Sequence, residues 1–111
     1  MANIRRYTSP TQELIVEGVD LTQADVFVSY KQGTTQLNIS GEDLTIETVS
    51  AGQRTDTKIS VYMSQEMTAS FVADKDVDVQ VNWLEDGQRN ATTIARVSVQ
   101  RNLLEEVIHS E

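Results

Sequence analysis

The sequence predicts an all-β protein, an antiparallel β-sandwich with one short connector helix near residues 64–71. Three observations support this fold class. About seven short runs alternate apolar with polar residues, and turn signals rich in Gly, Asp or Ser separate them at intervals of roughly 8–12 residues. No long stretch has helical periodicity, so the chain offers no crossover helices for a parallel sheet. No internal repeat suggests a solenoid or another repeat architecture.

The clearest of these signals is the stretch from residue 77 to residue 100. Every second residue from Val77 to Trp83 is apolar, which is the pattern of a strand with one buried and one exposed face. The dipeptide Asp86-Gly87 follows, and it accepts the positive φ angles of a tight hairpin turn. The alternating run 91–100 then predicts an antiparallel partner strand. We predict a hairpin in which Trp83 packs in the core, with an interface anchor as the alternative.

The earlier part of the chain divides into further short strands. Residues 1–11 contain few apolar side chains and the only proline, so they predict an N-terminal arm or edge segment. The sandwich domain is expected to span residues 12–101. Its other strands are predicted at residues 12–17, 26–31, 36–40, 44–48 and 55–63.

The period of the pattern changes after residue 63. Met63, Met67 and Phe71 recur every four residues, and Ser64 stands where a helix N-cap is favoured. Glu66 lies near the positive end of such a helix. We therefore predict one or two helical turns between strands, a connector too short to be stable alone.

The last residues, 102–111, form a predicted apolar C-terminal segment. Its four large apolar residues are Leu103, Leu104, Val107 and Ile108. They share one helical face, although a final strand is an alternative. The segment could dock on its own sandwich or form an arm that pairs with a neighbouring subunit, since open sheet edges must be covered or used. We take these four residues as the candidate interface and keep both alternatives.

Length and composition limit the function. With 111 residues and no cysteine, the chain has room for one domain whose fold depends on packing, as suits a reducing compartment. A formal charge of −8 would repel a phosphate backbone, so we expect no nucleic-acid partner. No segment has the pattern of a signal peptide or approaches the ~20 apolar residues of a membrane span. We therefore expect a protein made in the cytosol, with no membrane partner.

No motif for catalysis, cofactor binding or metal binding stands out. Three aspartates within residues 74–78, followed by Glu85, copy part of the EF-hand spacing, but Val79 stands where that loop needs glycine. His109 is the only imidazole, and near the C-terminus it would lack the rigid scaffold that a catalytic base requires. We expect no enzymatic activity, no cofactor and no bound metal.

Five short segments stand out when the chain is considered as one pattern. They are DVFVSYKQG (25–33), EDLTIET (42–48), SVYMSQEMTASF (60–71), VQVNWLEDG (79–87) and RNLLEEVI (101–108). This order resembles small virion proteins of tailed phages and prophages of gut bacteria. In those proteins a strand ending in Gln-Gly is followed by a Leu-Ser/Thr-Gln-Glu-x-Thr connector, a Val-Gln-Val strand with a glycine turn and a Leu-x-x-x-Ile end. Here Met63 replaces the usual leucine of the connector.

The resemblance implies an immunoglobulin-like β-sandwich that is a structural, non-enzymatic part of the virion, at the capsid surface, neck or tail. Such subunits would form a homo-oligomer or dock on other virion structural proteins through sheet edges and terminal segments. The expected location is the virion, assembled in the cytoplasm of a bacterial host. The alternative is a small cytosolic or virion-borne binding module that recognises a protein or a carbohydrate through the sandwich loops.

Overall fold

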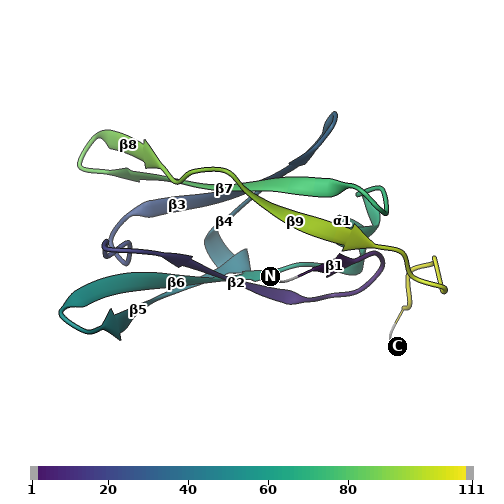
Figure 1. The fold of residues 1–111 in the computed structure, drawn as a ribbon, viewed down its shortest axis with the longest axis horizontal. Coiled ribbons are helices and arrows are strands. Elements are labelled where there is room, and N and C mark those ends of the chain that lie inside the picture. Colours follow the sequence, from purple (N-terminus) through teal and green to yellow (C-terminus); the bar gives the residue numbers. More distant parts are fainter. Residues whose placement is uncertain (1–2, 110–111) are drawn as a thin grey trace.

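The computed structural model describes residues 3–109, which form nine strands, one α-helix and one 3₁₀ turn (Figure 1). The elements in chain order are β1 (Ile4–Arg5), β2 (Thr11–Val16), β3 (Asp25–Gln32), β4 (Thr35–Ser40), the 3₁₀ turn (Gly41–Asp43), β5 (Leu44–Ala51), β6 (Arg54–Tyr62), α1 (Gln65–Ala69), β7 (Asp76–Glu85), β8 (Gln88–Ala91) and β9 (Ala95–Gln100). Figure 1 shows two layers, with β3, β7, β8 and β9 above β2, β5 and β6. The prediction of a predominantly β, sandwich-like fold is confirmed.

The two layers are sheets of unequal size. The larger has the strand order β1-β9-β7-β3-β4, with β8 also paired to β7, and the smaller has the order β2-β6-β5. All pairs are antiparallel except one, because β1 runs parallel to β9 with Ile4 opposite Val99. The prediction of purely antiparallel pairing is therefore wrong at this edge. After β1 on the larger sheet, the chain crosses to the smaller sheet at β2.

The core lies between the sheets and follows the alternation seen in the sequence. In β3 and β7 every second side chain is buried against the smaller sheet. The buried apolar residues of the core are Ile4, Val16, Leu21, Val26, Val28, Tyr30, Ile39, Ile59, Val61, Met63, Phe71, Val77, Val79, Val81, Val97 and Val99. Trp83 is half-buried and packs against this cluster, as the core interpretation predicts.

The predicted hairpin forms, but its second strand is interrupted. Asp86 and Gly87 have φ angles of 53° and 78°, which suit the tight turn between β7 and β8. The expected continuous strand 91–100 is wrong, because it divides into β8 and β9. Asn82 lies opposite Ala91 and Val79 opposite Ala95, so β7 advances three residues while its partner advances four. This extra residue is a β-bulge, and it lies where Thr92-Thr93-Ile94-Ala95 departs from strict alternation.

The connector helix is confirmed as α1, which links β6 to β7. Ser64 is its N-cap, and its Oγ accepts a hydrogen bond of 3.1 Å from the backbone N–H of Met67. The backbone N–H of Ser64 in turn donates a hydrogen bond to Sδ of Met67, with 3.5 Å between nitrogen and sulfur. Ser64 therefore satisfies one of the N–H groups that the start of a helix leaves free.

The C-terminal segment forms neither of the two structures considered from the sequence. Residues 101–109 contain bends and no regular helix or strand. Figure 1 shows this segment beyond the end of β9, next to β1 and α1. The pattern of two adjacent leucines, two glutamates and two further apolar residues fits one helical face, but so short a segment is not stable as a helix without extensive packing, and three of its four large apolar side chains are exposed.

Candidate functional site

The acidic stretch that copies part of the EF-hand spacing is a turn leading into β7. Asp74 has a φ of 65°, and its N–H donates a 2.9 Å hydrogen bond to the carbonyl of Val99. Within residues 3–109 no group of three or more His, Asp or Glu side chains is placed to hold a metal ion. In the same part of the chain, no helix has the length and hydropathy needed to cross a bilayer.

The candidate interface of the sequence analysis lies on an exposed segment. Leu103 is 99% exposed, Ile108 is 63% exposed and Leu104 is 48% exposed, whereas Val107 is half-buried. Burying an apolar side chain of this size stabilises a structure by roughly 1.5–3 kcal/mol relative to leaving it in water. The described chain therefore leaves this apolar surface uncovered. Docking of the leucines on their own sandwich, one of the two alternatives, is not seen.

Polar contacts hold the backbone of this segment in place. Gln65 in α1 donates from Nε2 to the carbonyl of Ile108 at 2.9 Å and accepts from the Ile108 N–H at 2.8 Å. Asn102 Nδ2 donates to the carbonyl of Arg6 at 3.1 Å, and Arg6 forms an ion pair with Glu105. The segment is thus tethered at residues 102, 105 and 108 while its leucines face solvent.

Arg6 also joins this tether to the body of the protein. Its Nε donates to the carbonyl of Phe71 at 2.7 Å, and one terminal nitrogen donates to the carbonyl of Ala69 at 3.2 Å. Ala69 is the last residue of α1, so the guanidinium lies at the negative end of the helix. A single largely buried side chain therefore connects the N-terminal edge, the helix and the C-terminal segment.

A second feature lies between the sheets, where two edges are open on the same side of the molecule. β2 pairs with β6 along one side, and no strand within residues 3–109 pairs with its other side. β1 covers only the end of β9, opposite Val99 and Gln100, which leaves the outer edge of β9 from Ala95 to Ser98 unpaired by the described strands. An open edge exposes backbone N–H and C=O groups that can pair with another chain.

Two adjoining hollows of about 290 and 240 Å³ lie between these open edges. We call this region the β2–β9 seam. The residues that line it and carry the argument are Gln12, Leu14, Val79, Val81, Ala95 and Val97. Three of these residues, Val79, Val81 and Val97, belong to the core, and Leu14 packs against it. The seam therefore gives access to apolar surface between the sheets.

One buried polar group in the wall of the seam lacks a partner. Gln12 is 2% exposed, and its Oε1 accepts a 2.9 Å hydrogen bond from the hydroxyl of Tyr30. Within residues 3–109 no group accepts a hydrogen bond from Gln12 Nε2. Burial also raises the pKa of the Tyr30 hydroxyl well above its ordinary value. Because an unpaired buried donor is costly, an acceptor that enters the seam would gain from pairing with this amide.

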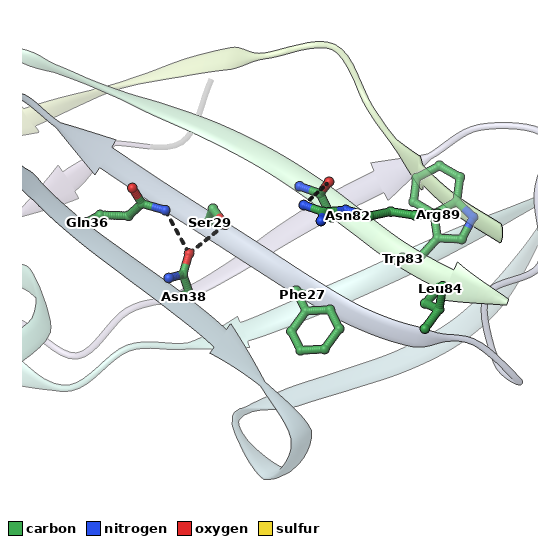
Figure 2. Close-up of a pocket in the computed structure, with 8 residues that line it drawn as sticks. All are labelled: Phe27, Ser29, Gln36, Asn38, Asn82, Trp83, Leu84 and Arg89. Carbon is green, nitrogen blue, oxygen red and sulfur yellow. Dashed lines mark hydrogen bonds between the residues drawn. The ribbon is translucent and has the colours of Figure 1, made fainter. Parts of the chain in front are cut away.

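A third feature is a hollow of about 520 Å³ on the outer face of the larger sheet (Figure 2). Its side chains come from β3, β4, β7 and β8. Ser29 and Gln36 both donate hydrogen bonds to Oδ1 of Asn38, at 2.8 and 3.0 Å, and Figure 2 shows these bonds converging. Phe27 and Leu84 line the same hollow and are about two-fifths exposed, at 44% and 43%. The face combines a preorganised polar network with two exposed apolar side chains.

Comparison with known proteins adds no family to this description. No protein-family model matches the chain, and no curated protein sequence matches it significantly.

The four residues predicted from the sequence lie on one segment, but the groups that hold it were not predicted. Arg6, Gln65 and Asn102 belong to no motif, and Arg6 lies 63 residues before Ala69, whose carbonyl it contacts, so no local pattern marks it. The seam was also missed, because it exists where a strand is lacking and no local sequence pattern marks it.

Proposed function

We propose that the protein is a non-enzymatic structural component of a tailed phage or prophage particle, located in the virion and assembled in a bacterial cytoplasm. The resemblance of its five segments to small virion proteins supports this proposal. Identical copies assemble with one another or with other virion proteins through sheet edges and terminal segments. Nucleic acid and membranes are not partners, in keeping with the charge of −8.

The single observation that carries the assembly proposal is the state of the C-terminal segment. Its backbone is fixed by Gln65, Arg6 and Asn102, yet Leu103 is 99% exposed. A frayed terminus would need no such contacts. Exposed apolar side chains on a fixed backbone are typical of a surface that a partner covers. Because the segment is already ordered, binding loses less conformational entropy.

We also propose that the sandwich is immunoglobulin-like. If β2 is lettered B, β8 is treated as an extension of the β7 hairpin and the other strands are followed in chain order, the smaller sheet contains B, E and D, and the larger contains G, F, C and C′, which is the immunoglobulin arrangement. The buried Tyr30 then occupies strand C, where antibody domains place a tryptophan.

Two measurements test the virion proposal. The gene should lie within a block of capsid and tail genes, and the protein should be found by mass spectrometry in purified particles of that phage. A gene outside such a block, or particles that form without the protein, would count against it.

The second candidate function is a binding module. The outer-face hollow favours it, because exposed Phe27 beside the amides of Gln36 and Asn38 resembles the mixture of apolar and polar contacts found in ligand sites. The binding surface is then a sheet face rather than the loops. A glycan array on which the protein binds no glycan would exclude carbohydrate recognition as this function.

A further inference from the structure

We propose that the β2–β9 seam of one subunit receives the C-terminal segment 101–109 of a second copy, which exchanges its Gln65 contacts for backbone pairing along the open edge of β2. This inference rests on the proposed assembly function and names the surface that performs it. Strand addition to an open edge gains backbone hydrogen bonds along the edge and places alternate side chains into pockets.

The seam has the features that an added strand requires. β2 offers a free edge from Thr11 to Val16 along the smaller sheet, and β9 offers one from Ala95 to Ser98 along the larger. Both hollows between them are severalfold larger than the roughly 30 Å³ of one water molecule, so each can admit a large side chain. Their walls include Leu14, Val79 and Val81.

The unpaired amide of Gln12 is an independent indication that a ligand enters the seam. Its Nε2 has no acceptor within residues 3–109, although the side chain is 98% hidden from solvent and lines the smaller hollow. A strand in the seam brings carbonyl oxygens along its whole length. Pairing one of them with Gln12 would remove the cost of a buried donor left unsatisfied.

The C-terminal segment of another copy is the occupant that this chain itself supplies. The segment carries Leu103, Leu104 and Ile108 in solvent, and the seam supplies apolar surface to cover them.

The segment belongs to a different copy because its own seam lies elsewhere. The contacts of Ile108 with Gln65 hold the segment at the α1 end of the sandwich (Figure 1). A contact between two different surfaces is heterologous, so repetition produces rings or open helical arrays rather than a closed dimer.

Disulfide trapping tests this contact directly, because the chain contains no cysteine. Two full-length single variants, Leu103→Cys and Ala95→Cys, are mixed and oxidised mildly. The control mixture pairs Leu103→Cys with Phe27→Cys, which lies on the outer face of the larger sheet. All three positions are exposed, so each variant should fold. Circular dichroism of each variant verifies this.

We expect the Leu103–Ala95 mixture to form the mixed disulfide about tenfold faster than the control mixture, because docking raises the local thiol concentration. Equal rates in the two mixtures, while sedimentation still shows oligomers, would overturn the seam contact and leave the assembly proposal standing. Equal rates together with a monomer at every concentration would overturn both.

Discussion

The hydroxyl of Tyr30 in β3 donates a hydrogen bond of 2.9 Å to Oε1 of Gln12 in β2, and so joins the two sheets inside the core. Tyr30 is fully buried and Gln12 nearly so. Because neither group meets solvent, each depends on the other for hydrogen bonding.

Tyr30→Phe should therefore lower the free energy of unfolding by about 1–3 kcal/mol, since it leaves the Gln12 carbonyl unpaired in the core. Urea denaturation followed by circular dichroism measures this change. The control is Tyr62→Phe, because the Tyr62 side chain is 44% exposed and its hydroxyl bonds to Thr45 at the surface. Equal losses in the two variants would contradict the role assigned to the inter-sheet bond.

Arg6→Gln should loosen the C-terminal segment and lower stability. The substitution removes the contacts to the Phe71 and Ala69 carbonyls and to Glu105, and charged hydrogen bonds of this kind are worth roughly 2 kcal/mol each or less. Hydrogen exchange should become faster across residues 102–108. Arg89→Gln, at an exposed arginine of β8, is the matched control and should leave the exchange of that segment unchanged. Unchanged protection in Arg6→Gln would show that the tether lies elsewhere.

Stability should depend on pH through Asp56. The N–H of Gly18, at 2.9 Å, and then the guanidinium of Arg54, at 2.8 Å, hold the pKa of this carboxyl below its usual value. A carboxyl with a lowered folded-state pKa stabilises the fold above its unfolded pKa of about 4, and the benefit is lost as the pH falls through the folded value.

Asp56→Asn should consequently lower Tm at pH 7, and the difference from the natural sequence should shrink below about pH 4. Glu42→Gln, on the exposed 3₁₀ turn, should change Tm little at neutral pH. A Tm difference for Asp56→Asn that stays constant down to pH 2 would exclude the ionised carboxyl as its cause.

The sequence predicts those parts of the fold that local chemistry determines. Alternation in β3 and β7, glycine at the turns and Ser64 before α1 act over a few residues, and the structure contains the strands, hairpins and cap that they predict. The bulge between β8 and β9 lies where Thr92-Thr93-Ile94-Ala95 departs from strict alternation, but so short a departure does not by itself specify a bulge. The parallel pairing of β1 depends on how the chain crosses between the sheets, which no local pattern reports.

The candidate site divides in the same way. Four apolar residues at the end of a small acidic chain mark the C-terminal segment, whereas Arg6, Gln65 and the pair formed by Gln12 and Tyr30 act on groups distant in the sequence. Such contacts come from packing, so they carry no periodic signal.

The central claim is that exposed leucines of the C-terminal segment drive assembly, and sedimentation equilibrium over a wide concentration range tests it most directly. The samples are the natural sequence, the double variant Leu103→Asp with Leu104→Asp, and the matched control Phe27→Asp with Leu84→Asp on the outer face of the larger sheet. We predict that the natural sequence and the control form oligomers, while the tail variant stays at the 12.4 kDa of one chain with its fold intact. A tail variant that assembles as well as the natural sequence, or a natural sequence that remains at 12.4 kDa at every concentration, would contradict the account.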